Sequence, residues 1–239
     1  MVVDPQIESA LRLSNLRDVP PEVLGSILST AIEVRLPAGS VSTREGERAR
    51  HVELVITGAL RLFVVASDGR TMTVRYCRAG AIIGAVSLFA PEYATPVTTQ
   101  ALVDSRLLKM PAAAVTRAAS RDVRVAGAFL SELGERVMSF IYEIPGNAFA
   151  TVRQRVARHL LDLSLGLEVG RLPDLQRPGE LAVSQSQQDL ADAVGTAREV
   201  VVRVLRELRE EGVIRTGRNR IVIADPVRLA REAEWNRSS

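Results

Sequence analysis

The 239-residue sequence predicts an α+β fold in which an N-terminal β-roll, or jelly roll, precedes one long helix and a smaller helical domain. Three observations support this prediction. Apolar residues alternate between glycines from Val34 to Met110, an apolar heptad repeat spans residues 123–144, and two capped helices follow residue 184. We expect three parts, with boundaries at 1–116, 117–146 and 147–239.

Composition and charge limit the class of protein. Lys and Arg number 31 against 28 Asp and Glu, and the hydrophobic share of 46% is ordinary for a globular chain. No apolar run reaches the ~18 residues of a membrane span, and the acidic start MVVDPQIESALRL does not resemble a signal peptide. We therefore expect a cytoplasmic protein that does not bind membranes. All basic residues except Lys109 are arginine, which suits phosphate and guanine recognition, although GC-rich codon usage explains most of this bias.

The N-terminal part is predicted to begin with two short helices, Ile7 to Leu13 and Pro21 to Ile32, before the chain turns to β-structure. Val52, Leu54 and Ile56 alternate with other residues, and the runs starting at Leu60 and Met72 repeat this pattern. Asp68-Gly69 lies between two such runs and predicts a hairpin. Antiparallel strands with frequent turns indicate the β-roll.

The long predicted helix has an apolar stripe with strict 3-4 spacing. A helix packed on its own domain usually shows a wider stripe, so the narrow seam favours a partner helix and hence a symmetric homodimer. Pro145-Gly146-Asn147 is predicted to end the helix. The expected dimer-interface residues are Val123, Ala126, Leu130, Leu133, Val137, Phe140 and Ile144.

The C-terminal part predicts a helix-turn-helix. One helix begins at Thr151 and ends near Leu165, and a loop is expected at 171–180. Ser186 with Asp189 resembles a capping box for a helix over 187–194, which Gly195 ends. Thr196 with Glu199 resembles a second capping box, for a helix that continues to about Glu210.

The second of these helices has a core face and a polar face. Val201, Val204, Leu205 and Leu208 form the apolar stripe, whereas Glu199, Arg203 and Arg206 share a different face beside Arg198. Arginine pairs with guanine and glutamate with cytosine in the major groove. The simpler alternative is a surface ion pair between Glu199 and Arg203, worth a few tenths of a kcal/mol. The two helices and the hairpin after them favour DNA binding.

That hairpin consists of two short apolar strands around a basic glycine turn within residues 213–223, and it predicts a wing that contacts phosphate. The expected DNA-binding residues are Ser186, Gln187, Thr196, Arg198, Glu199, Arg203, Arg206, Arg218 and Arg220.

From about Leu11 to Ile223 the chain resembles the CRP/FNR family of bacterial transcription regulators. The resemblance rests on LPAGSVSTREGERARHVELVITGALRLF, on RAGAIIGAVSLFA, on the long helix, and on VSQSQQDLADAVGTAREVVVRVLRELREEGVI. It implies a cyclic-nucleotide-binding-like β-roll, a winged helix-turn-helix domain, and a homodimer that binds a palindromic promoter site and contacts RNA polymerase. The cAMP-responsive branch has an Arg-Glu pair followed by an Arg, which Arg198, Glu199 and Arg203 match. We therefore expect half-sites similar to TGTGA.

The predicted effector pocket departs from the best-known family member. That protein has Gly-Glu-Leu in its phosphate-binding cassette and an Arg-Ser pair eleven residues after the glycine. A buried phosphate without an arginine is poorly compensated, so we predict that the chain does not use cAMP in the usual way. The pocket is expected to be apolar and to accept an uncharged or hydrophobic ligand, unless side chains fill it. Its expected residues are Gly84, Ala85, Val86, Ser87, Leu88, Thr95, Pro96, Phe140 and Ile141.

Other cofactors and activities find little support. The single cysteine, Cys77, cannot hold an iron–sulfur cluster, and no metal site is predicted. His51 and His159 are expected to be surface or packing residues rather than haem ligands, and Cys77 a half-buried strand residue rather than a redox switch beside Arg75 and Arg78. No catalytic constellation is present, so an enzyme is not expected. The alternative function is a ligand-binding sensor that binds DNA only when liganded.

Overall fold

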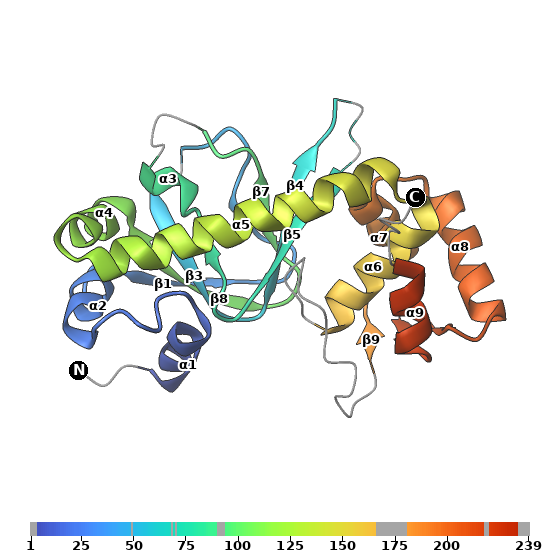
Figure 1. The fold of residues 1–239 in the computed structure, drawn as a ribbon, viewed down its shortest axis with the longest axis horizontal. Helices are drawn as coiled ribbons and strands as arrows, with labels where there is room; N and C mark the ends of the chain where they lie inside the picture. The colour runs from blue at the N-terminus through green and yellow to red at the C-terminus, as the bar shows by residue number, and fades with distance from the viewer. Residues whose placement is uncertain are drawn as a thin grey trace. The chain divides into compact units, whose positions relative to one another are not determined.

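The computed structural model describes residues 4–48, 50–67, 69, 71–89, 94–165, 181–217 and 220–233, without the side chains of Ser87 and of residues 142–149 and 165. The chain falls into two compact units (Figure 1). The first comprises Met1–Val64 and Val74–Val137, and the second comprises Val65–Thr73 and Met138–Ser239.

Two four-stranded antiparallel sheets form the β-roll. One sheet has the order β1-β8-β3-β6, with bounds Ile32–Leu36, Ser105–Pro111, His51–Thr57 and Ile82–Ile83. The other has the order β2-β7-β4-β5, with bounds Val41–Thr43, Thr98–Ala101, Ala59–Val65 and Thr71–Arg78. Gly69, at the predicted hairpin between β4 and β5, has a φ of 83°, a conformation that favours glycine. The β-roll prediction is therefore confirmed.

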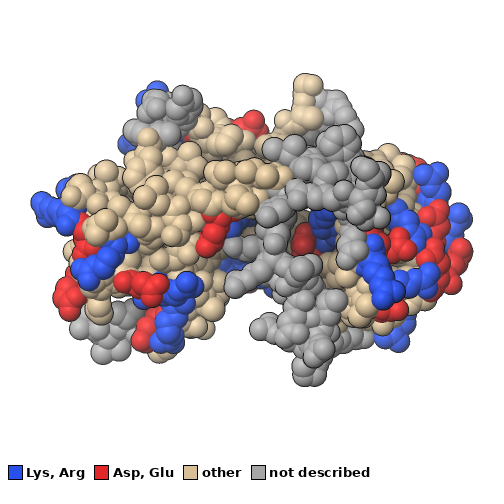
Figure 2. Space-filling view, in the orientation of Figure 1, with Lys and Arg blue, Asp and Glu red and all other residues tan. Residues whose placement is uncertain are grey.

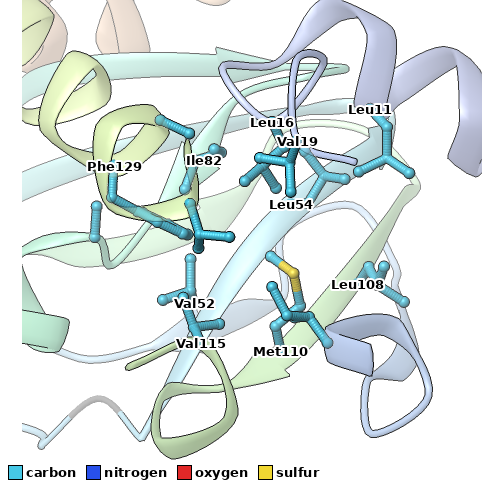
Figure 3. Close-up of a cluster of buried hydrophobic side chains, with 14 of the residues drawn as sticks. Leu11, Leu16, Val19, Val52, Leu54, Ile82, Leu108, Met110, Val115 and Phe129 are labelled. Atoms are coloured by element: carbon cyan, nitrogen blue, oxygen red, sulfur yellow. The ribbon is translucent and has the colours of Figure 1, made fainter. Parts of the chain in front are cut away.

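Four helices cover the outer face of the first sheet. They are α1 (Pro5–Leu13), α2 (Pro21–Leu28), α4 (Ala112–Arg121) and the first part of α5 (Val123–Phe149). Phe129 of α5 is fully buried there, and the strands contribute side chains such as Val52 and Met110 (Figure 3). This face therefore provides the core that fixes α5 on the β-roll.

The space between the two sheets is filled largely by apolar side chains. Val55, Ile83 and Leu107 of the first sheet pack against residues of the second, which include Leu60 and Cys77. Successive side chains of β3 point to opposite faces of the sheet. Val52, Leu54 and Ile56 pack under the helices, in the outer core, and Val55 packs between the sheets, in the inner core.

Two predicted helix ends are wrong. The second helix ends at Leu28 rather than at Ile32, because Ile32 starts β1 and pairs with Lys109 of β8. The long helix continues through Pro145 and ends at Phe149. Proline removes one backbone hydrogen bond but keeps a helical φ, so a helix can continue through it, usually with a kink.

The second unit has its own core of helices and a small sheet. The helices are α6 (Val152–Leu165), α7 (Gln187–Val194), α8 (Arg198–Glu210) and α9 (Pro226–Ala233), and the sheet order is β10-β11-β9, with bounds Ile214–Gly217, Arg220–Ile223 and Ala182–Val183. Leu160, Leu190, Leu208, Val213 and Leu229 are fully buried in this core. Thr151 caps α6 as predicted, since its hydroxyl accepts from the Gln154 amide and the Gln154 side chain accepts from the Thr151 amide. The predicted loop at 171–180 lies outside the described residues.

Candidate nucleic-acid interface and effector pocket

A capped helix followed by a tight glycine turn begins the helix-turn-helix. The Ser186 hydroxyl accepts a hydrogen bond from the Asp189 amide, and the Asp189 carboxylate accepts from the Ser186 amide. Gly195 ends α7 with a φ of 67° and a ψ of 49°. The predicted capping box and its glycine stop are therefore both present.

The second predicted capping box is wrong. The residue at the N-cap of α8 is Ala197, and no side chain caps this helix. The Thr196 amide instead donates to the carbonyl of Ala191, which continues the C-terminal turn of α7. Thr196 is thus part of the turn, and among the described residues no side chain caps the first amides of α8, where the helix dipole favours an anion.

The recognition-type helix α8, which is labelled in Figure 1, has the two faces that the sequence predicts. Val201, Val204, Leu205 and Leu208 are buried against the rest of the unit. Arg198, Glu199, Arg203 and Arg206 are exposed on the other side. Gln187 is exposed at the start of α7, whereas Ser186 and Thr196 are partly buried at the turns.

The simpler explanation of the polar face does not hold in the structure. Within the described part of the chain no ion pair joins Glu199 to Arg203, and Arg206 approaches only Glu210, at 4.0 Å. Arg198 and Arg203 form no ion pair within the same residues, so both guanidinium groups are available to an external acceptor. On the face shown in Figure 2, basic and acidic side chains are intermixed over this part of the chain.

An arginine-centred network fixes the other end of α8. The Arg153 guanidinium of α6 donates to both carboxylate oxygens of Glu211, at 2.9 and 2.8 Å, and to Glu232 of α9 at 2.9 Å. Arg228 donates to the same Glu211 carboxylate at 2.9 Å. These hydrogen bonds, chiefly the one from Arg153, hold the pKa of Glu211 below its usual range. The network therefore links the C-terminal end of α8 to α6 and α9 through charge-assisted hydrogen bonds.

The predicted wing is a two-stranded hairpin. Gly217 pairs with Arg220, and Ile214 pairs with Ile223, whose strand also pairs with β9. Ile221 and Ile223 face the core, and Arg220 is exposed. Arg218 lies outside the described residues.

The apolar seam of α5 is largely exposed. Val123 is 82% exposed, Leu130 63% and Val137 56%, and Phe140 is also exposed. Ile141, which is predicted for the effector pocket and not for the seam, is exposed as well. Contiguous exposed apolar side chains of this kind are typical of interaction surfaces. Two further seam residues depart from this pattern, since Leu133 packs partly against the outer core and Ala126 is half-buried. The Ile144 side chain is outside the described residues.

The predicted effector-pocket residues fall into both units. In the first, Gly84 has a φ of 84°, and a Cβ there would lie 3.0 Å from the carbonyl oxygen of His51. The short helix α3 (Val86–Phe89) follows; Ala85 and Leu88 pack into the outer core and Val86 is exposed. Thr95 is half-buried and Pro96 exposed. Phe140 and Ile141 belong to the second unit, and the Ser87 side chain is not described.

Buried charges in the first unit were not predicted. Glu132 of α5 is 4% exposed and accepts from Arg75 of β5 at 3.2 Å, with Arg136 at 3.5 Å. Arg75 also donates to the Ile82 carbonyl at 2.8 Å, so one ion pair links β5, β6 and α5. A second buried pair joins Glu53 to Lys109 at 2.9 Å. One feature of the sequence indicates such a buried charge. In HVELVIT, Glu53 occupies a position that strand alternation directs into the roll.

Cys77 and His159, the residues considered for redox or haem sensing, are buried by packing. Cys77 is fully buried in the apolar core between the sheets, rather than half-buried as predicted. His159 of α6 is buried and lies 3.0 Å from the Gln185 side chain, and burial lowers its pKa to about 4. Among the described residues no group of three or more His, Cys, Asp or Glu side chains is arranged to hold a metal. None of the described helices is long and apolar enough to cross a membrane.

Comparisons with known proteins match both units. The family model for a cyclic nucleotide-binding domain matches residues 33–122, and that for a Crp-like helix-turn-helix domain matches residues 154–232. The chain is 32% identical to the transcriptional regulator LdrP of Thermus thermophilus over 196 residues, which are 79% of this chain and 90% of LdrP. It is 26% identical to the cAMP-activated global transcriptional regulator Vfr of Pseudomonas aeruginosa over 195 residues, covering 80% of this chain and 88% of Vfr.

Solved structures show the same fold. A CRP/FNR-family transcriptional regulator from Thermus thermophilus matches with a TM-score of 0.69 and 27% identity, over 84% of this chain and 98% of that one. The fold and the exposed polar face of α8 therefore define a DNA-binding transcription regulator with a cyclic-nucleotide-binding domain. This chain belongs to the CRP/FNR family.

Proposed function

We propose that the protein is a homodimeric regulator that binds a palindromic promoter site with half-sites similar to TGTGA. The observation that supports this best is the exposed face of α8. Arg198, Glu199 and Arg203 lie near its N-terminus, and the two arginines form no ion pair within the described residues. N-terminal residues of a recognition helix reach base edges, with arginine bound to guanine and glutamate to cytosine.

The homodimer rests on the exposed seam of α5. Val123, Leu130 and Val137 are more than half exposed although they follow a heptad spacing. A symmetric pair of α5 helices would bury this stripe, and a homodimer supplies the two α8 helices that a palindromic site with half-sites about one helical turn (~34 Å) apart requires. By family resemblance the dimer contacts RNA polymerase, and its place of action is the cytoplasm.

The effector response is proposed to differ from that of the cAMP-activated relatives. Ala85 and Thr95 stand where the best-known family member has a glutamate and an arginine for the nucleotide. Without that arginine a cyclic phosphate lacks a charged partner in the β-roll cassette. We therefore expect specific DNA binding that does not require cAMP.

Replacement of one base-reading arginine tests the DNA proposal. Arg203→Ala is expected to weaken binding to a labelled TGTGA palindrome by about 10- to 100-fold, with a much smaller change for a scrambled duplex. Arg209→Ala is the matched control, because it removes the same charge from the last turn of the same helix. Equal losses for both variants, or equal losses for both duplexes, would refute the assignment of α8 as the base-reading helix.

A further inference from the structure

Three polar side chains meet between the two sheets of the β-roll. The Glu53 carboxylate of β3 accepts a hydrogen bond from the Ser42 hydroxyl of β2 at 2.6 Å and lies 2.9 Å from the Lys109 ammonium of β8. β2 belongs to one sheet, and β3 and β8 to the other. Glu53 shares with Val55 the face of β3 that points into the roll, and Ser42 and Lys109 meet its carboxylate there.

The two oxygens of this carboxylate have different surroundings. Ser42 and Lys109 both bind Oε1. Oε2 is buried, and among the described residues it has no hydrogen-bond partner, although Glu53 is only 4% exposed. A buried carboxylate oxygen without a donor is costly, and most buried polar atoms in folded proteins are paired. The site therefore lacks one donor.

Glu53, which carries the unpaired oxygen, belongs to a strand that adjoins the predicted effector residues beginning at Gly84. Glu53 pairs across the sheet with Ile83, the residue directly before Gly84. The Gly84 turn packs against the backbone of His51 in the same strand, since a Cβ there would lie 3.0 Å from the His51 carbonyl oxygen. Lys109 is partly exposed, so the group is not sealed from solvent at its end.

We propose that Glu53, Lys109 and Ser42 bind a neutral small molecule with adjacent hydroxyl groups, such as a sugar or the ribose of a nucleoside. This rests on the proposed function, because it names the class of effector for that regulator. One hydroxyl donates to Oε2 of Glu53, and its neighbour accepts from the Lys109 ammonium. Glu53 and Lys109 already neutralise each other, so a ligand with a net charge would add an uncompensated charge to a buried site. Hydroxyl groups supply both the missing donor and an acceptor without charge.

The test measures binding to the full-length protein by calorimetry and thermal shift. The probes are adenosine, uridine, D-ribose, D-glucose and myo-inositol, with cAMP and 2′-deoxyadenosine as comparisons. At least one diol is expected to raise the midpoint of thermal unfolding. If the ligand is a nucleoside, 2′-deoxyadenosine binds at least about tenfold more weakly than adenosine, since it lacks one of the two hydroxyls. A response to D-ribose, D-glucose or inositol alone identifies a free sugar or polyol instead.

Glu53→Gln removes the charge with little change in shape, and it is expected to weaken ligand binding at least about tenfold. Glu22→Gln is the control, because Glu22 is an exposed carboxylate of the same unit. This variant is expected to leave ligand binding unchanged. The proposal is overturned if none of the diols binds, if cAMP alone binds, or if Glu53→Gln binds as tightly as the parent protein. Should the variant fail to fold, the comparison of diols with the deoxy analogue decides.

DNA affinity is measured on the same samples. Diol binding without DNA binding contradicts the proposed function only, and DNA binding without diol binding contradicts this inference only.

Discussion

The ion pair between α5 and the β-roll gives the sharpest stability prediction. Glu132 is buried, and its two oxygens serve three side chains: Arg75 at 3.2 Å, Arg136 at 3.5 Å and Asn15 at 2.9 Å. Glu132→Ala removes the carboxylate and leaves two guanidinium groups in a poorly hydrated site. We expect the free energy of unfolding to fall by about 3–5 kcal/mol, the usual cost of removing one partner of a buried pair.

Glu135→Ala is the matched control for this variant. Glu135 lies one turn further along α5, is exposed, and accepts from the same Asn15 side chain at 3.3 Å. Its removal is expected to cost less than about 0.5 kcal/mol, as for most surface substitutions. The two variants thus differ mainly in burial of the carboxylate.

Urea and thermal unfolding followed by circular dichroism measure the difference. For a chain of this size, the expected loss for Glu132→Ala corresponds to a fall of the unfolding midpoint on the order of 6–20 °C. The double variant Glu132→Leu with Arg75→Met is expected to recover part of the loss, since it also removes the buried guanidinium charge that Glu132 compensates. Equal midpoints for Glu132→Ala and Glu135→Ala would refute the assigned role of the buried pair.

Three further predictions concern the seam, the helix cap and the buried histidine. Leu130→Glu is expected to convert a dimer to a monomer in analytical ultracentrifugation. Helix content should not fall, because this side chain is 63% exposed in the single chain. A variant that stays dimeric would contradict the assignment of the α5 seam as the dimer interface. Ser186→Ala is expected to cost about 1 kcal/mol in urea unfolding through the lost cap, and the exposed Ser26→Ala to cost less. Burial lowers the pKa of His159 to about 4, so the unfolded chain takes up the proton more readily than the folded one. The second unit should therefore lose up to about 3 kcal/mol as the pH falls from 6.5 to 4, and His159→Gln should flatten this dependence.

Patterns that depend on local spacing could be predicted from the sequence. The alternation around Val52 places strands, and the capping box at Ser186 and the glycine stop at Gly195 set the ends of α7. The stripe of α8 gives its buried face because 3.6-residue periodicity determines which side chains point inward.

Features that depend on contacts between distant segments could not be predicted. Ile32 leaves the helical pattern because β8 offers it a partner strand, and Thr196 is engaged by the turn that follows α7 rather than by α8. The buried pairs of Glu53 with Lys109 and of Glu132 with Arg75 join residues more than 50 positions apart. Sequence spacing carries no information on such pairs, so neither ion pair could be predicted.

The central claim is that α8 reads a palindromic site without cAMP. Fluorescence anisotropy of the purified protein with a labelled TGTGA palindrome and a scrambled duplex tests it most directly, across a salt series because phosphate contacts are salt-dependent. The account predicts binding to the palindrome at least about 10³-fold tighter than to the scrambled duplex, unchanged by cAMP. Equal affinity for both duplexes, or specific binding that requires cAMP, would contradict it.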